Sequence, residues 1–402
     1  MLMTVSLAIA GLSLLIWVGL LTLWGNFWRC DQMLPALSSP TPQFPNSPSP
    51  LPTVCAIIPA RNEADMLPNS LPSLLNQAYP GDFRIILIDD QSSDGTGQVA
   101  RQLAEDLGQS ARLSVIQAEP LPAGWTGKLW AMEQGVRHAS TFSPLPDYFL
   151  LTDADICHDS ENLNQLVAKA QQADLDMVSL MVLLRCQSFW EKLLIPAFVF
   201  FFQKLYPFPL VNDFNRRMAA AAGGCILIRR EALEKIGGLQ ILRQALIDDC
   251  SLAQAVKTKG RGKKAEGRIW LGLTETTRSL RPYDSLQTIW DMVARTAYTQ
   301  LNYSPLLLAG TLVGMTIIYL VPPIATIIGL ATQQWLLGSL GIATWALMTI
   351  AYFPTIRLYR LSPLWAVCLP AIAFLYNLMT IDSAIRHWRG QGGAWKGRVY
   401  PN

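Results

Sequence analysis

The amino-acid sequence predicts an α/β domain built on a parallel β-sheet and joined to transmembrane α-helices. Between Val54 and about Tyr283, short apolar runs typical of strands alternate with amphipathic runs typical of helices, and this alternation is characteristic of parallel sheets. Charged residues are missing from residues 1–28 and again from residues 296–356. Of the 402 residues, 51% are hydrophobic and only 15% are charged, which is unusual for a soluble protein of this length.

The N-terminal segment is predicted to anchor the chain in a membrane. The apolar run from Ser6 to Trp24 is long enough to span a bilayer. It has neither the basic start nor the small-residue cleavage site of a signal peptide, so we assign residues 1–28 to a transmembrane anchor. Residues 29–53 are rich in proline and serine, a composition that favours an extended linker.

Residues 54–285 are predicted to form the α/β domain. Three segments rich in β-branched residues have the length of buried strands: residues 54–60, 83–90 and 113–119. Two segments between them have helical spacing: residues 69–78 and 95–108. Strands that alternate with helices form βαβ units, and the sheets built from them bind ligands at the carboxyl ends of their strands.

Polar clusters follow three of the predicted strands. The segment from Pro59 to Glu63 follows the first strand, and Asp89 and Asp90 end the second. Asp153 and Asp155 end a further buried run, "YFLLTDADI". Each cluster taken alone is equally consistent with an acidic surface turn. Because the carboxyl ends of parallel strands meet at one edge of the sheet, the three clusters together predict a nucleotide site there.

One apolar segment inside the predicted domain, residues 188–210, is too short to span a bilayer. It is rich in aromatic residues and carries lysines near both ends. This pattern fits a helix that lies in the headgroup layer of a membrane. A buried core helix fits the same composition, so the sequence leaves both interpretations open.

Residues 286–385 are predicted to form a C-terminal membrane region with about three apolar helices. Two apolar runs cover residues 306–332 and 336–353, and a third lies between Arg360 and Asp382. Together with the anchor they would make four spans.

Four full spans conflict with the distribution of charge. They would place the basic tail, residues 386–402, on the opposite side of the membrane from Arg29. Basic residues near membrane helices tend to stay on the cytoplasmic side. Either one C-terminal run re-enters or lies at the membrane surface, or this tendency fails here.

Composition excludes several other classes of protein. A net charge of +3 gives no basis for general nucleic-acid binding. The seven cysteines are scattered, without a C-x-x-C pair and with an odd total, which argues against a zinc site and against a disulfide framework. Such cysteine usage suits a reducing cytoplasm.

Six motifs occur in the order "IIPARNE", "ILIDDQSSDGT", "TGKLWAMEQG", "LLTDADI", "AAGGCILIRREALEKIGGL" and "IDDCSLAQAVKTKG". Over roughly residues 54–260 this series resembles the family-two glycosyltransferases, among them the hopene-associated glycosyltransferases and, more distantly, the ceramide glucosyltransferases. The resemblance implies a Rossmann-like GT-A fold. It also implies a membrane-bound hexosyltransferase that moves a sugar from a nucleotide-sugar donor, such as a UDP-sugar, to a hopanoid-like or other membrane lipid.

The resemblance assigns donor-binding roles to the polar clusters. Asp90 would accept a hydrogen bond from the uracil imide, and the segment with Pro59, Arg61 and Glu63 would surround the base and ribose. Lys128, at the start of a helical pattern, would meet the diphosphate, where free helix N–H groups add to the attraction. Taken alone, Asp90 is better explained as a residue of a capped turn, and Lys128 as a surface lysine at a helix start; only the order of the motifs favours the donor roles.

The resemblance makes the D-x-D pair a metal site. Asp155 would bind Mg²⁺ or Mn²⁺, and Asp153 would assist the metal or contact the ribose, because a divalent cation offsets the charge that builds on the departing diphosphate. In an extended segment both carboxylates would face the same side. His158 is nearby in the sequence but is interpreted as a polar loop residue, and His138 and His387 receive no role.

The acceptor side is assigned to Asp248 and Asp249. In the resemblance, Asp249 is the base that takes the proton of the acceptor hydroxyl for an in-line displacement with inversion, and Asp248 supports it. Asp248 departs from the usual Glu-Asp pair of the family, which puts only the supporting role in doubt. An N-cap aspartate before a helix is the rival explanation. Arg295 is a candidate diphosphate contact, although a membrane-border arginine fits its position at least as well.

The favoured interpretation is therefore a metal-dependent glycosyltransferase in the cell inner membrane, with a cytoplasmic catalytic domain and a lipid acceptor. A processive polysaccharide synthase should show a Q-x-x-R-W motif and more membrane helices. A non-catalytic scaffold or transporter should have lost the acidic residues. The sequence meets neither expectation.

Overall fold

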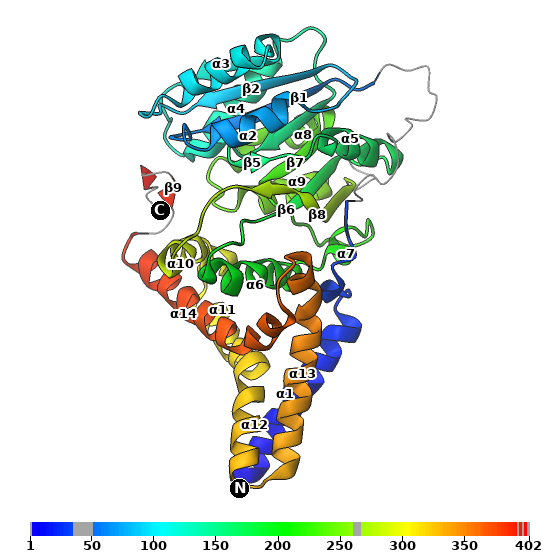
Figure 1. Cartoon of the computed structure of the whole chain (residues 1–402), viewed down its shortest axis with the longest axis vertical. Coiled ribbons are helices and arrows are strands. Elements are labelled where there is room, and N and C mark those ends of the chain that lie inside the picture. The colour runs from blue at the N-terminus through cyan, green and yellow to red at the C-terminus, as the bar shows by residue number, and fades with distance from the viewer. Residues whose placement is uncertain (1, 35–50, 260–266, 392–393, 396–397, 400–402) are drawn as a thin grey trace.

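The computed structural model describes residues 2–34, 51–259, 267–391, 394–395 and 398–399. A sheet domain at one end of the molecule continues into a layer of short helices and then into a bundle of long apolar helices (Figure 1). The N-terminal end of the chain lies at the tip of the bundle, far from the sheet. Most of the predicted linker, residues 35–50, lies outside the described residues.

Within the described residues the main sheet has eight strands, in the order β3-β2-β1-β4-β7-β6-β8-β5. They are β1 (Val54–Ala60), β2 (Phe83–Asp89), β3 (Leu113–Gln117), β4 (Tyr148–Thr152), β5 (Ile156–Cys157), β6 (Met177–Leu183), β7 (Cys225–Arg229) and β8 (Ile269–Ser279). A second, two-stranded sheet pairs β9 (Ala394–Trp395) with β10 (Arg398–Val399).

The prediction of a parallel sheet is confirmed for β1, β2, β3 and β4 and for the pair of β6 and β8, and it is wrong for β5 and β7. β1 pairs in parallel with β2 and β4, and β2 with β3. β7 runs antiparallel to both of its neighbours, and β5 runs antiparallel to β8. The first strands are joined by helical crossovers, which keep strands parallel. The chain from β6 to β7 instead passes through the helical layer and returns from the opposite end.

Helices cover both faces of the sheet. They are α2 (Leu67–Leu75), α3 (Thr96–Asp106), α4 (Gly127–Ala139), α5 (Asn162–Gln172), α8 (Arg230–Ile236) and α9 (Asp248–Lys259), with 3-10 turns η2 (Ser110–Arg112) and η3 (Leu239–Leu242). Successive residues of a strand point to opposite faces, so Ile57 packs in the core that contains α4 and α9, and Ile58 in the core that contains α2 and α3. Burial on both faces explains why β1 is apolar throughout.

A layer of helices separates the sheet domain from the bundle (Figure 1). It contains α6 (Phe189–Leu205), α7 (Phe208–Val211), α10 (Leu286–Ala294) and the 3-10 turns η4 (Thr299–Leu301) and η6 (Pro363–Cys368). α6 begins with a capping box, in which Ser188 and Glu191 satisfy each other's backbone N–H groups. Phe200 of α6 is buried, while Phe189 and Leu205 at its ends are exposed. α6 is therefore partly buried and lies at the level where the apolar helices begin.

Four helices of the described chain are long and apolar enough to cross a membrane. The first is α1 (Leu2–Leu23), and the third is α13 (Trp335–Leu358). The second is one continuous helix made of α11 (Pro305–Met315), the π-helical turn η5 (Thr316–Leu320) and α12 (Val321–Ala331). The fourth is formed by η6 together with α14 (Leu369–Trp388). A short 3-10 turn, η1 (Phe27–Arg29), follows α1. α12 and α13 pack with their backbones close together, because a Cβ atom at Gly329 would lie 2.2 Å from the backbone nitrogen of Gly338.

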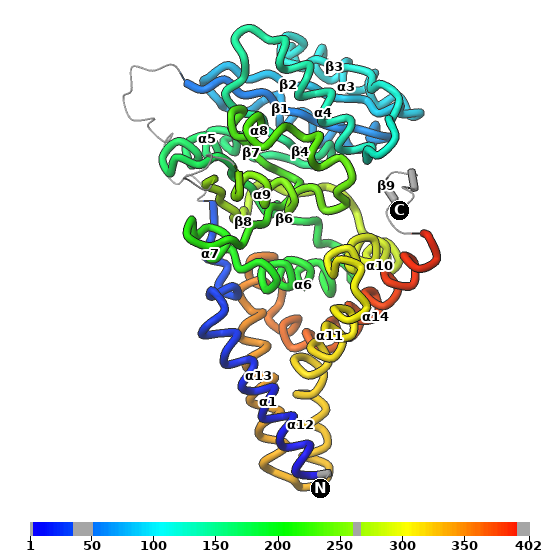
Figure 2. The backbone as a smooth tube through the Cα atoms, turned by 180° about the vertical axis from the view of Figure 1, so that it is seen from behind, coloured from blue at the N-terminus to red at the C-terminus, as the bar shows by residue number. Residues whose placement is uncertain are grey.

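α14 differs in direction from the other long helices. α1, α12 and α13 run side by side to the tip of the bundle, whereas α14 lies obliquely below the sheet domain (Figures 1 and 2). At its start, Trp365 of η6 contacts Phe189 of α6, with ring centroids 5.7 Å apart. Near its end, Arg386 pairs with Asp291 of α10 at 2.7 Å. Both ends of α14 thus contact the helical layer.

Three basic residues near the apolar helices lie at one end of the bundle. Arg29 belongs to η1, which contacts α6, and Arg386 pairs with Asp291 of α10 at 2.7 Å. Arg360 pairs with Glu275 of β8 at 3.4 Å. The expectation that one C-terminal run re-enters or lies at the membrane surface stays a prediction.

Candidate active site

The carboxyl ends of β1 and β2 carry the residues predicted to bind the nucleotide. Asp90 is 1% exposed, and the Arg61 guanidinium donates to its carbonyl oxygen at 2.6 Å and lies 3.8 Å from its carboxylate. Glu63 is also buried, and its backbone N–H donates to Thr96 Oγ1 at 2.9 Å. Pro59 lies inside β1 and is buried, so it supports this edge from within. The structure brings the other three residues together at one edge of the sheet.

Asp153 and Asp155 follow β4 and point to different partners. The chain turns directly after the strand, where the Ile156 N–H donates to the Asp153 carbonyl at 3.3 Å, so the extended geometry expected from the sequence is wrong. Asp153 Oδ1 lies 2.7 Å from Lys128 Nζ. Asp155 Oδ2 accepts a hydrogen bond from Ser279 Oγ at 2.8 Å. The turn therefore directs one carboxylate toward α4 and the other toward the end of β8.

Arg281, which was not identified from the sequence, joins Asp155 to the β1 edge. Its Nε lies 3.3 Å from Asp155 Oδ2, and its Nη2 lies 2.7 Å from Glu63 Oε1. Burial opposes the charge of Arg281, but the two carboxylates raise its pKa above the ordinary value. Arg281 is 126 and 218 residues away from these partners along the chain. No motif surrounds it, so only the fold reveals the contact.

Lys128, the second residue of α4, lies in a cluster of carboxylates. Its Nζ is 2.7 Å from Asp153 and 3.9 Å from Asp248. Burial would lower the pKa of Lys128, but the charges of these aspartates raise it, so the side chain stays a cation. Burial raises the pKa of the Asp153 carboxyl, and the charge of Lys128 opposes that effect. A fixed cation at a helix N-terminus is suited to meet a diphosphate.

Asp249 lies in the first turn of α9. Its carboxylate accepts hydrogen bonds from the Gly223 N–H at 2.9 Å and from the Cys250 N–H at 2.7 Å. A Cβ atom at Gly223 would lie 3.4 Å from Asp249 Oδ2 and 3.5 Å from Lys128 Nζ, so Gly223 lies in contact distance of both charged groups. Burial, followed by the charge of Asp248, raises the pKa of Asp249 to about 6. This carboxylate is fixed in place and can act as a proton acceptor near neutral pH.

Two polar residues of the helical layer, Tyr206 and Gln300, contact each other near Cys250 and were not identified from the sequence. Tyr206 follows α6, and its hydroxyl accepts a hydrogen bond from the side-chain amide of Gln300 in η4. Burial is the main cause that raises the pKa of Tyr206 to about 12, with further contributions from the neighbouring Cys250 and Asp249. The helical layer therefore supplies a hydroxyl group near Cys250, the residue that follows Asp249, and within the influence of the Asp249 charge.

A small pocket of about 10 Å³ lies beside these charged groups. Lys128, Asp248 and Asp249 contribute to its wall, and leucines of α4, η3 and α9 line much of the rest. A larger hollow of about 260 Å³ lies near the other ends of the strands, where Asp147 and Arg229 line it. Three of the predicted site residues, Lys128, Asp248 and Asp249, line the smaller pocket, and none lines the larger one.

The remaining candidates lie apart from this cluster. His158 is buried, and its ring nitrogens contact Thr152 Oγ1 and Asn162 Nδ2, each at 3.0 Å. It is therefore a structural residue of the segment after β5. Arg295 ends α10 and is exposed, and its charge acts on Tyr283. Its contact with a diphosphate stays a prediction.

The chemistry of the site fits a divalent cation. Among residues that the structure describes, no three His, Cys, Asp or Glu side chains are grouped as metal ligands. Asp153 and Asp155 nevertheless offer the carboxylate oxygens that Mg²⁺ and Mn²⁺ prefer. Asp155 already pairs with a positively charged group, because Arg281 Nε lies 3.3 Å from its Oδ2. These residues suit a metal whose other ligands are diphosphate oxygens and water.

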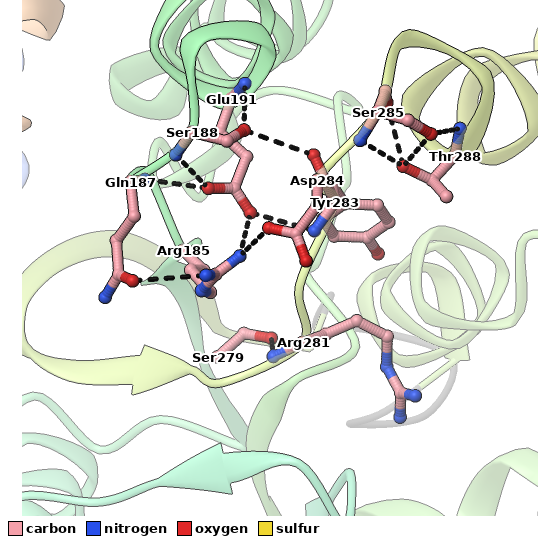
Figure 3. A network of polar contacts seen from close by, with 10 residues as sticks. All are labelled: Arg185, Gln187, Ser188, Glu191, Ser279, Arg281, Tyr283, Asp284, Ser285 and Thr288. Carbon is pink, nitrogen blue, oxygen red and sulfur yellow. Dashed lines mark hydrogen bonds and ion pairs between the residues drawn. The ribbon is translucent and has the colours of Figure 1, made fainter.

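Figure 3 shows how the segment after β8 is fastened to the helical layer. Glu191 is 0% exposed and accepts hydrogen bonds from the Tyr283 N–H at 2.8 Å and from Arg185 at 2.7 Å. Arg185 also pairs with Asp284 at 2.6 Å. Arg281 stands on the same segment (Figure 3). The backbone that carries Arg281 is thus fixed to the start of α6.

Comparisons with known sequences agree with this geometry. Residues 55–237 match the family model described as "Glycosyl transferase family 2". The chain is 24% identical over 351 residues to a 4,4'-diaponeurosporenoate glycosyltransferase of Staphylococcus aureus. This alignment covers 86% of this chain and 87% of that protein. It is also 30% identical over 115 residues to a probable glycosyltransferase, YdaM, of Bacillus subtilis. That alignment covers 28% of this chain and 25% of that protein.

A solved structure shares the architecture. The mannosyltransferase PcManGT of Pyrobaculum calidifontis, in complex with GDP-Man and Mn²⁺, matches 95% of this chain and 99% of its own, with a TM-score of 0.51 and 19% identity. At this identity the match shows the fold: a mixed α/β domain of the GT-A type followed by long apolar helices.

Proposed function

We propose that this chain acts as a family-2 glycosyltransferase and transfers a sugar from a nucleotide-sugar donor, such as a UDP-sugar, to a lipid acceptor in the membrane, in keeping with its matches to the family model and to a known glycosyltransferase. The observation that carries the proposal is a continuous run of contacts along one edge of the sheet. It leads from Glu63 through Arg281 to Asp155, and from the adjacent Asp153 through Lys128 to Asp248. Donor residues and the proposed base thus share one site.

The nucleotide is proposed to lie on the β1 and β2 edge. Asp90 would accept a hydrogen bond from the base, and Arg61 and Glu63 would surround the ribose. Lys128 would pair with the diphosphate, because its charge is fixed at the N-terminus of α4 and points into the cluster.

Transfer is proposed to be a single displacement with inversion. Asp249 takes the proton of the acceptor hydroxyl, the acceptor oxygen bonds to the anomeric carbon, and the bond from that carbon to the diphosphate oxygen breaks. Mg²⁺ or Mn²⁺ held by Asp155, with help from Asp153, would supply positive charge opposite the departing diphosphate. Asp248 supports Asp249 by raising its pKa toward neutrality.

A lipid acceptor is proposed because Asp249 lies next to the helical layer. Tyr206 and Gln300 come from that layer and meet near Cys250, the residue that follows Asp249. The relative from Staphylococcus aureus is named for diaponeurosporenoate, which favours an extended isoprenoid acceptor, either carotenoid-like or hopanoid-like. In this arrangement the apolar body would stay in the membrane and only its polar end would reach the base.

The sheet domain is proposed to face the cytoplasm from the inner membrane, where sugar nucleotides are available. All seven cysteines are free thiols, which suits that compartment. Arg29, Arg360 and Arg386 lie at the same end of the bundle, as expected for the cytoplasmic side.

The experiment that tests this function supplies radiolabelled nucleotide sugars, one at a time, to the protein in membranes that contain an isoprenoid lipid extract. We expect label in an extractable lipid, dependent on Mg²⁺ or Mn²⁺, and absent from membranes that carry the Asp249→Asn variant. Label in a polymer would instead favour a processive polysaccharide synthase. Absence of any labelled product across the donor panel would contradict the proposal.

A further inference from the structure

Asp155, the proposed metal ligand, is already paired with a cation of the same chain. We propose that Arg281 is a built-in counter-ion that competes with the divalent metal for Asp155 and releases this carboxylate when the metal binds. The inference rests on the proposed function, because that function makes Asp155 a metal ligand. It adds a residue that regulates how readily the site accepts the metal.

The positions of the three side chains support an exchange of cations. The Arg281 side chain is 29% exposed, whereas those of Asp155 and Glu63 are 10% and 7% exposed. Arg281 is therefore the most exposed member of this group and contacts both of the more deeply buried carboxylates. A metal that binds Asp155 has to share this carboxylate with Arg281 or displace it.

Arg281 can leave Asp155 and still keep a partner. Its contact with Glu63 is the shorter one, 2.7 Å against 3.3 Å to Asp155. A guanidinium has five N–H donors in a planar fork, so loss of the Nε contact leaves the Glu63 contact in place. Without a metal, Arg281 offsets the repulsion between two nearby buried carboxylates. With a metal, Glu63 alone retains it.

The exchange needs movement of a side chain only. The Leu280 N–H donates to the Asp155 carbonyl at 2.9 Å, and the Tyr283 N–H donates to Glu191 at 2.8 Å. These two bonds fix the backbone on both sides of Arg281, and Figure 3 shows the second of them. The guanidinium can therefore rotate while the segment that carries it stays in place.

The test measures Mn²⁺ binding to the purified full chain without any nucleotide sugar, by the loss of the free-ion signal in electron paramagnetic resonance. Arg281→Gln removes the competing charge and keeps a polar side chain, so we expect binding of Mn²⁺ to be about five- to tenfold tighter than in the unmodified protein. Arg281→Lys keeps the charge and should stay close to the unmodified value. Arg229→Gln is the matched control, because it removes an arginine that pairs with Asp174 at 3.3 Å, far from Asp155.

A second variant is expected to change the affinity for Mn²⁺ in the opposite direction. Glu63→Gln removes the alternative partner of Arg281, so the arginine is held more firmly on Asp155 and binding of Mn²⁺ should weaken. A general loss of stability would weaken binding in both variants and cannot produce opposite shifts.

Unchanged or weaker Mn²⁺ binding in Arg281→Gln overturns the inference. If no variant binds Mn²⁺ even with a nucleoside diphosphate present, the metal site and the inference fall together. The proposed sugar transfer is decided separately, by the labelled-lipid assay, so the two failures are distinguishable.

Discussion

The two halves of the sheet contribute to the site in different ways. In the parallel half, Asp90 and Asp153 follow β2 and β4 directly, so each strand places its own carboxylate at the shared edge. In the other half, Asp249 lies in the first turn of α9 and Arg281 follows β8. Both reach the edge through contacts with residues far away in the sequence. The parallel half therefore places its candidate residues directly at strand ends, whereas the other half places them through contacts between distant segments.

The largest expected effect is the loss of sugar transfer when Asp249, which lies outside the parallel half, is replaced. Asp249→Asn removes the proposed proton acceptor, so sugar transfer to lipid should fall roughly 10³-fold. Donor binding should change little, because the donor residues belong to the parallel half. Radiolabelled transfer and calorimetric titration with the nucleoside diphosphate measure the two quantities. Substantial turnover by this variant would exclude Asp249 as the base.

The next effect compares the two aspartates of the D-x-D pair. Asp155→Ala should lower metal-dependent transfer roughly 10²-fold, because the charge opposite the diphosphate is lost. Asp153→Ala should cost less, since Asp153 pairs mainly with Lys128. Titration of activity with Mn²⁺ distinguishes them: only Asp155→Ala should require much more metal. Equal metal requirements would argue against their different orientations.

The pH profile tests the environment of Asp249. Burial and the charge of Asp248 raise its pKa to about 6, and only the ionised form accepts a proton. Transfer should therefore fall about tenfold per pH unit below that pKa and level off above it. Asp248→Asn removes the neighbouring charge, so the profile should shift to lower pH. A shift to higher pH would contradict the proposed coupling.

The smallest effect concerns the helical layer itself. Tyr206→Phe removes the hydroxyl near Cys250 and Asp249, so kcat/KM for the lipid should fall about fivefold, the value of one hydrogen bond. Hydrolysis of the donor by water should stay unchanged. Tyr79→Phe is the control, because it removes a buried hydroxyl that donates to Pro52 at 2.6 Å inside the sheet domain. Equal losses in both variants would indicate a general structural effect.

The two halves of the sheet also differ in how much of their structure could be predicted from the sequence. β1, β2 and the start of α4 follow from apolar runs and their flanking turn residues, so the placement of Asp90 and Lys128 was predictable. The turn that separates Asp153 from Asp155 was not predictable, because a D-x-D tripeptide fits both extended and turned backbones. The antiparallel β7 was also missed, since its direction is decided by the route of the chain through the helical layer.

The residues that sequence reasoning missed have partners far along the chain. Arg281 meets Glu63 across 218 residues, and Tyr206 meets Gln300 across 94. A local pattern contains no information on such pairs. The orientation of α14 is a similar case, because its composition fits a span while Asp291 and Phe189 hold its two ends at the helical layer.

The close packing of α12 on α13 has a consequence for how the chain enters a membrane. The turn between these helices contains Gln333 and Gln334, and neither helix carries a charged side chain before Arg357. The pair can therefore form a hairpin and insert from the side of synthesis without moving any ionised side chain through the hydrocarbon interior, which is the costly step in translocation. A lysine placed at Gly329, where even a Cβ atom would lie 2.2 Å from the backbone nitrogen of Gly338, would both separate the two backbones and oppose that entry.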